Sequence, residues 1–185
     1  MSNKIRSIKE IFAEALKYYQ KKDFKTAEIL CNKILSIDSN HFDSLFMSAT
    51  LNALEKNFQG AKKLLLKANE LNPQHLGTLN NLATAFKELK DFKKAESYYF
   101  TILKLKPDHV NANYNLGLIF LVQKDFLSAK KYLEKTVNLQ PNFAYAHFTL
   151  GNVYAETKEY QSAKKSYQKV IDIRPDFAAA YNNIG

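Results

Sequence analysis

The chain has 185 residues, of which 46% are hydrophobic, and carries a formal net charge of +9 with a single cysteine, Cys31. This composition is that of a chain with a packed core. No apolar run approaches the roughly 18 residues that span a bilayer, and the polar, basic start has no apolar segment of a secretory signal behind it. One cysteine excludes an internal disulfide framework, so we expect a cytoplasmic protein without membrane insertion.

One unit of 34 residues recurs along the chain without an insertion. The same step separates five alanines, the aromatic residues three positions before them and four prolines: Ala27, Ala61, Ala95, Ala129 and Ala163; Phe24, Phe58, Phe92, Phe126 and Tyr160; Pro73, Pro107, Pro141 and Pro175. A fixed period of this length indicates a solenoid of stacked units. With the alanine at position 20, a tail of residues 1–7 precedes a single array of repeats at 8–41, 42–75, 76–109, 110–143 and 144–177, with a partial sixth at 178–185.

The first half of each repeat predicts an amphipathic helix. Positions 4, 7, 8 and 11 are mostly apolar, which is the spacing of one helix face; in the third repeat they are Leu79, Leu82, Ala83 and Phe86. Position 8 is always small, so we expect the second helix to approach closely there. The residues at this position are Ala15, Ala49, Ala83, Gly117, Gly151 and Gly185.

A short turn and a second helix complete each repeat. The turn ends in an Asp or Asn, such as Asp125, that can cap the next helix, and Glu159 takes this place in the fifth repeat. The buried stripe of the fourth repeat is predicted to be Ala129, Tyr132, Leu133, Thr136, Val137 and Leu139. The proline at position 32 cannot continue the helix. At position 33, four residues are predicted to cap the following first helix: Asn40, Asp108, Asn142 and Asp176.

This pattern of small, aromatic, alanine and proline residues resembles the tetratricopeptide repeat family over about residues 8–185. The resemblance implies an all-α fold, a right-handed superhelical solenoid of stacked antiparallel helix pairs. The asparagines at position 6 are also similar, at three of six places, to those lining the repeat superhelix of O-linked N-acetylglucosamine transferase. These asparagines are Asn81, Asn115 and Asn183.

No catalytic constellation is visible in the sequence. His41, His75 and His109 occupy one repeat position and are interpreted as turn residues, while His147 and Cys31 are predicted to be core residues. No glycine-rich phosphate loop or metal-ligand spacing is present. We therefore expect no enzyme activity, no cofactor and no bound metal.

The basic charge comes almost entirely from lysine. Only Arg6 and Arg174 of the 27 basic residues are arginines, whereas base and phosphate recognition favours the planar arginine fork. We expect no specific nucleic-acid binding. Lysine pairs early in the second helices could form a basic outer ridge or simply a solvated face: Lys62-Lys63, Lys93-Lys94, Lys130-Lys131 and Lys164-Lys165.

A predicted binding groove lies on the first helices, opposite their buried face. Positions 2, 5, 6, 9, 12 and 13 point there, and the family resemblance implies that this face lines the concave surface. An asparagine amide both donates and accepts, so it can bind a peptide backbone without reading its sequence. The candidate residues are Asn80, Asn81, Tyr114, Asn115, Leu118, Leu121, Tyr145, Phe148, Asn152 and Asn183. Packing between neighbouring first helices is the alternative for Leu118 and Phe148.

These observations favour a non-catalytic scaffold that binds an extended peptide or partner protein in its groove. The alternative is the N-terminal recognition or oligomerisation fragment of a larger enzyme, a glycosyltransferase or another transferase with its catalytic domain beyond Gly185. The sixth repeat stops at its position 8, so its apolar face, including Tyr181, lacks the second helix that would cover it. The chain could therefore self-associate through this open C-terminal end.

Overall fold

The structure, a computed structural model, describes residues 7–184. In this range eleven α-helices follow one another through short turns, and there is no β-strand. The first helices of the five full repeats have 13 residues each: α1 Ile8–Gln20, α3 Phe42–Leu54, α5 Leu76–Glu88, α7 Val110–Val122 and α9 Ala144–Glu156. The second helices have 14: α2 Phe24–Ile37, α4 Phe58–Leu71, α6 Phe92–Leu105, α8 Phe126–Leu139 and α10 Tyr160–Ile173. The last helix is α11, Ala178–Ile184.

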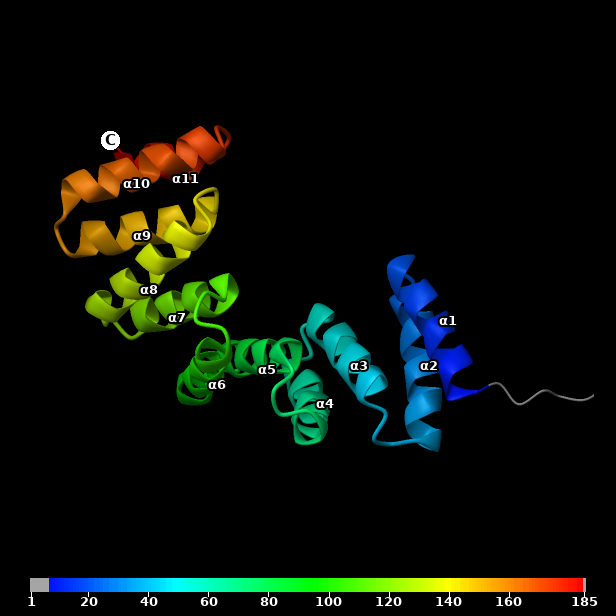
Figure 1. Cartoon of the computed structure of the whole chain (residues 1–185). Helices are drawn as coiled ribbons and strands as arrows, with labels where there is room; N and C mark the ends of the chain where they lie inside the picture. Colours follow the sequence, from blue (N-terminus) through cyan, green and yellow to red (C-terminus); the bar gives the residue numbers. More distant parts are fainter. Residues whose placement is uncertain (1–6, 185) are drawn as a thin grey trace, which may run out of the picture. The chain divides into compact units, whose positions relative to one another are not determined.

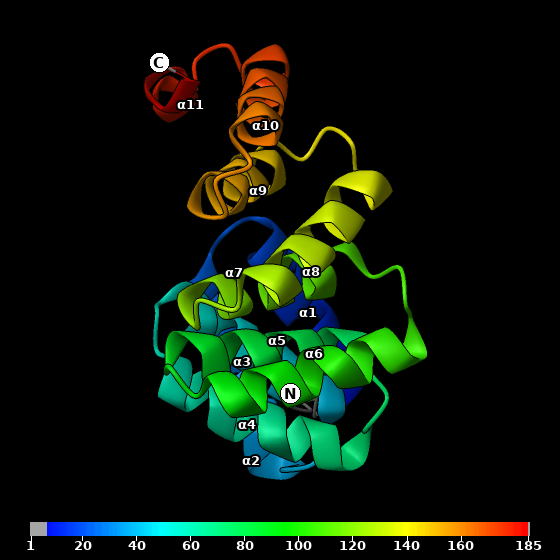
Figure 2. The same cartoon turned by 90° about the vertical axis from the view of Figure 1, so that its left-hand side faces the viewer.

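The chain divides into two compact units, Met1–Tyr98 and Tyr99–Gly185, with the boundary inside α6. In the first unit α1 pairs with α2 and α3 with α4, and each pair also contacts the next first helix (Figure 1). In the second unit α7 pairs with α8 and α9 with α10, and α11 packs on α10 (Figure 2). The predicted all-α class of stacked antiparallel helix pairs is confirmed. The single array over residues 8–185 stays a prediction.

The buried face of the first helices is the predicted one. Leu79, Leu82, Ala83 and Phe86 are all at most 4% exposed. The small residue at position 8 is required by packing, because a Cβ added to Gly117 would lie 2.6 Å from Cγ of Leu133. The close approach of Leu133 to Gly117 places position 8 of α7 against α8, as the repeat register predicts.

The predicted buried stripe of the fourth repeat is correct in part, because Tyr132 and Val137 are only half-buried. Ala129, Leu133 and Thr136 are buried, but Leu139 is 39% exposed, so its predicted burial is wrong. At 100° per residue, position 30 lies about 80° away from position 20 around the helix, which places it at the edge of the stripe. Other residues at position 30 are exposed too: Ile37, Leu71 and Leu105.

The turn inside each repeat holds a cap and a left-handed residue. As predicted, Asp125 Oδ1 accepts a hydrogen bond from the Ser128 N–H at 3.1 Å, whereas Glu159 makes no side-chain cap bond. The lysine before each cap has a positive φ of 60–62°: Lys22, Lys56, Lys90, Lys124 and Lys158. Side chains disfavour this region, and the sequence pattern did not predict it for lysine.

The caps of the first helices lie one residue later than predicted. His41, His75 and His109 each accept through Nδ1 from the backbone N–H three residues on, at 3.3, 3.1 and 3.2 Å. The capping role predicted for Asn40 and the other position-33 residues is therefore wrong. A cap must directly precede the first helical residue to reach the free N–H groups, and position 34 is that residue. Phe143 holds this place in α9 without a side-chain bond.

The His109 cap predicts a pH-dependent stability. Burial, assisted by nearby Lys106, lowers the pKa of His109, and a protonated Nδ1 cannot accept the Ala112 N–H. Because the folded-state pKa is depressed, the cap stabilises fully above the unfolded value of about 6.5 and is lost as pH falls through the folded value. His109→Asn caps at any pH, so between pH 7.5 and 5.5 the wild type should lose about 1 kcal/mol more than this variant.

Urea denaturation at the two pH values measures this difference. The pKa of His147 is also lowered, mainly by burial, but His147 is present in both chains and cancels in the comparison. An identical pH dependence in the two chains would mean that the His109 cap does not contribute.

Candidate functional site

The first hollow, named here the Asn81 hollow, lies in the first unit. It has a volume of about 210 Å³ and is formed by α3, the start of α4 and α5. Its lining is mostly apolar, with one amide and two hydroxyl groups: Thr50, Ala53, Leu54, Phe58, Asn81, Thr84 and Ala85. It could therefore hold an apolar side chain next to a polar backbone group.

The second hollow, named the Asn152 hollow, lies in the second unit. It has a volume of about 530 Å³ and brings three of the predicted groove residues together. It is lined by residues of α7, α9, α10 and α11: Leu121, Asn152, Ala155, Glu156, Tyr167 and Asn183. Glu156 adds a negative charge to a lining that is otherwise neutral.

Equivalent repeat positions line the two hollows. Each uses positions 9, 12 and 13 of one first helix and position 6 of the next: Thr50, Ala53, Leu54 and Asn81 in one, and Asn152, Ala155, Glu156 and Asn183 in the other. These positions share a helix face at 100° per residue. The predicted groove face is therefore the face on which both hollows open.

A hydrogen-bonded network fixes the Asn152 hollow. The Tyr167 hydroxyl donates to Asn152 Oδ1 at 2.8 Å, and Asn183 Nδ2 donates to the same oxygen at 3.2 Å. Burial raises the pKa of Tyr167, so its hydroxyl stays protonated and able to donate. The oxygen of Asn152 is thereby occupied, and the chemistry left to a ligand is the Asn152 Nδ2 donor and the Asn183 Oδ1 acceptor.

Six predicted groove residues lie outside both hollows on the first helices: Asn80, Tyr114, Asn115, Leu118, Tyr145 and Phe148. Asn115 donates from Nδ2 to the Asn111 carbonyl at 2.9 Å, while Asn80 Oδ1 is buried and has no hydrogen-bond partner within the described residues. Leu118 is half-buried. Tyr114 packs on Phe143 with ring centroids 4.7 Å apart, and burial raises its pKa.

The Tyr114 contact is one instance of a recurring pair of rings that the sequence analysis missed. A ring at position 5 meets the ring at position 34 of the same repeat at 4.7–5.4 Å between centroids: Phe12 with His41, Phe46 with His75, Tyr114 with Phe143, and Phe148 with Phe177. Phe148 also packs on Tyr167 at 5.8 Å. Position 5 thus packs against the turn that leads into the next repeat, and the ring at every position 34 was the sequence signal for it.

Tyr145 is the most exposed of the predicted aromatic residues, at 52%. The Arg174 guanidinium donates to its hydroxyl at 3.3 Å and lies 5.6 Å from the centre of its ring. Arg174 lies similarly close to the Phe177 ring, at 5.5 Å. Arg174 and Phe177 were not predicted as neighbours of Tyr145, although Arg174 is one of only two arginines in the chain.

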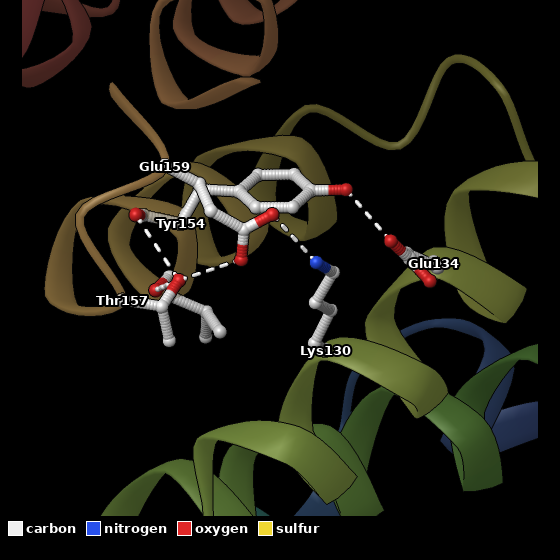
Figure 3. Close-up of polar contacts among 6 residues, drawn as sticks. Lys130, Glu134, Tyr154, Thr157 and Glu159 are labelled. Carbon is white, nitrogen blue, oxygen red and sulfur yellow. Dashed lines mark hydrogen bonds and ion pairs between the residues drawn. The ribbon is translucent and has the colours of Figure 1, made fainter. Parts of the chain in front are cut away.

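One lysine of the predicted basic ridge is part of a contact between repeats (Figure 3). Lys130 forms an ion pair with Glu159 at 2.7 Å and lies 5.0 Å from the centre of the Tyr154 ring. The Tyr154 hydroxyl donates to Glu134 at 2.7 Å. These contacts join α8 to α9 and to the turn after it, so Lys130 contributes to the packing of the second unit.

Neither a metal site nor a membrane span is found within residues 7–184. These residues contain no group of three or more His, Cys, Asp or Glu side chains arranged to hold a metal ion. No helix among them has the length and apolar character needed to cross a membrane. Cys31 is buried as predicted, and His147 is half-buried and forms a hydrogen bond with the Pro141 carbonyl at 2.9 Å.

The helix pairs and the repeated hollows define a helical-repeat solenoid. Comparison with models of protein families shows which kind of repeat it contains. Tetratricopeptide repeat models match residues 80–129 and 144–177, and the model of anaphase-promoting complex, cyclosome, subunit 3 matches residues 20–102. The chain belongs to the tetratricopeptide repeat family. A search of the curated proteins found no match.

Solved structures share the fold at low sequence identity. MamA from Desulfovibrio magneticus RS-1 is 18% identical with a TM-score of 0.84, covering 92% of this chain and 96% of that one. PilF from Pseudomonas aeruginosa is 22% identical with a TM-score of 0.82, covering 95% and 80%. YrrB, described as a TPR protein with an unusual peptide-binding site, is 19% identical with a TM-score of 0.80, covering 95% and 91%.

Proposed function

We propose that the chain is a non-catalytic scaffold that binds an extended peptide or partner segment through the first-helix face. The observation that carries the proposal is the equivalence of the Asn81 and Asn152 hollows, which open at the same repeat positions and each include an asparagine at position 6. A site repeated along a solenoid suits a ligand that is itself a chain of repeated units. An extended peptide is such a ligand.

The chemistry of the Asn152 hollow supports a backbone ligand. A peptide group presents one donor and one acceptor, and the Asn152 Nδ2 and Asn183 Oδ1 atoms offer the complementary pair. Leu121 and Ala155 provide apolar surface for a side chain next to that group. The hollow would therefore hold the main chain with little selection of its sequence, as predicted for the asparagine positions.

The comparisons bear differently on the other predictions made from the sequence. YrrB is described as peptide-binding, which supports the same role for this chain, whereas the alternative of a larger transferase gains no support from these comparisons. A cytoplasmic location stays a prediction from the single cysteine. Self-association through α11 also stays a prediction. The exposure of Tyr181 supports it, because Tyr181 is 50% exposed at the repeat position where Ile11, Leu45 and Leu79 are 2% exposed.

Replacing one amide in each hollow tests the proposal. Peptides selected from a random display library against the whole chain serve as ligands, and calorimetry measures their affinity. Asn81→Ala with Asn183→Ala should weaken binding on the order of tenfold, because each lost hydrogen bond contributes about 0.5–1.5 kcal/mol. Neither side chain is fully buried, so the melting temperature should hardly change.

Asn138→Ala is the matched control. Asn138 is an exposed asparagine on the second helix α8 and lines neither hollow. Its replacement should leave affinity unchanged. If the double variant binds the selected peptides as tightly as the wild type, the hollows are not the peptide site.

A further inference from the structure

A third hollow is built from second helices and is not used by the proposed peptide site. It has a volume of about 350 Å³ and lies in the second unit between α8 and the end of α6 with its following turn. We name it the lysine hollow. Its lining residues are Phe100, Leu103, Lys104, Pro107, Lys131, Tyr132 and Lys135.

The apolar part of the lysine hollow is formed by packed aromatic rings. Phe100 and Tyr132 meet with centroids 6.2 Å apart, and Tyr132 is supported on another side by Phe120 at 5.6 Å. Leu103 is half-buried and Pro107 is exposed. Ligand pockets begin at about 300 Å³, so the hollow can take one or two large apolar side chains but not a compact domain.

The charged part of the lysine hollow has one sign. Lys104, Lys131 and Lys135 are all exposed, and no carboxylate is among the lining residues. Lys131 and Lys135 are four residues apart on α8, so they share a face and repel each other. Within the described part of the chain none of the three forms an ion pair.

The neighbouring charges do not neutralise these lysines. Glu134 accepts the Tyr154 hydroxyl, and Glu159 is paired with Lys130, so both carboxylates are engaged at the contact between repeats (Figure 3). Asp108 follows Pro107 but is not part of the lining. Lys130 therefore has a structural role. The adjacent Lys131 forms no ion pair within residues 7–184, and its Nζ lies 5.6 Å from the centre of the Tyr132 ring, so its charge is held next to the apolar part of the hollow.

We propose that the lysine hollow binds an acidic segment of a partner protein, with one large apolar side chain inserted against the rings and carboxylates facing the three lysines. This surface is separate from the first-helix hollows and holds a ligand of different chemistry. A nucleic-acid backbone would pair with the lysines but would make no use of the apolar lining. Its bases would need open ring faces for stacking, whereas Phe100 and Tyr132 are half-buried against each other. The combination favours an acidic peptide.

Fluorescence anisotropy with a defined probe tests the proposal. The probe is a 12-residue peptide of Glu and Asp with one central Phe, measured at about 0.15 M salt so that weak surface attraction is screened. Lys131→Glu with Lys135→Glu should weaken its binding at least tenfold. Lys164→Glu with Lys165→Glu changes the net charge by the same amount on the exposed surface of α10 and should weaken binding less than twofold.

Two further measurements separate the alternatives. Changing the central Phe of the probe to Ser should weaken binding at least fivefold, and the same loss should be seen in a chain that carries Asn81→Ala with Asn183→Ala, in which the first-helix hollows are weakened. Equal weakening by the two lysine pairs, or no binding of the probe to the wild type, would overturn the proposal. A 12-nucleotide single strand that binds more tightly than the probe and depends on Lys131 and Lys135 would overturn it as well, in favour of nucleic acid.

Discussion

Gly151→Leu should destabilise the chain by about 3 kcal/mol, the upper end of the usual cost of overpacking a core. A Cβ at this position would lie 2.5 Å from Cε1 of Tyr167, and the leucine adds three more carbons on the same side. Tyr167 is 3% exposed, packs with Ala163 and Val170 and donates to Asn152, so displacing its ring disrupts this packing and that hydrogen bond. Urea denaturation followed by circular dichroism measures the loss.

Gly151→Ala is the control for this substitution. The third repeat has alanine and tyrosine at the same two positions, Ala83 and Tyr99, and both are fully buried. Alanine also gains up to about 1 kcal/mol of helix propensity over glycine, which offsets a small displacement of the ring. A Gly151→Leu variant as stable as the wild type would mean that the register of α9 against α10 is wrong.

Leu133→Ala should cost about 3–4 kcal/mol, within the range of 2–5 kcal/mol for leucine replacement in a core. Leu133 is fully buried in a cluster with Ala129, Leu150 and Val153, and its side chain covers Gly117. Gly117 has no side chain and Ala129 has only a methyl group, so neither residue can fill the space and a cavity remains. Thermal or urea denaturation measures the change.

Leu127→Ala, in the first turn of the same helix α8, is the matched control. Leu127 is 83% exposed, so its loss removes almost no buried surface and should change the unfolding free energy by less than about 0.5 kcal/mol. Similar losses for the two leucines would contradict the inward orientation of Leu133.

The period of the sequence was sufficient to predict the helices and the side of each that is buried. Five alanines at one spacing fixed the register, and small residues such as Gly117 and Gly151 identified where the helices of a pair meet. Helix ends were harder, because several residues near each end are able to cap. Histidine is not among the preferred caps, so the acidic or amide neighbour at position 33 was favoured over His109.

The face of the first helices opposite the buried side follows from helical geometry alone, and both hollows open at positions on this face. The side chains that are accessible there do not follow from it. Which side chains remain accessible depends on tertiary partners that periodicity does not show: Phe148 is packed against Phe177, while Asn152 is held by Tyr167. The left-handed lysines, such as Lys124, were missed because their conformation is imposed by the turn and not by their own preference.

The central claim is that an extended peptide binds through the first-helix hollows, and side-chain amide signals test it most directly. In a titration of the 15N-labelled chain with a display-selected peptide, the NH₂ signals of Asn81, Asn152 and Asn183 should shift saturably, and that of Asn138 should not move. Shifts confined to residues outside the two hollows, with these three amides unchanged at saturation, would contradict the claim.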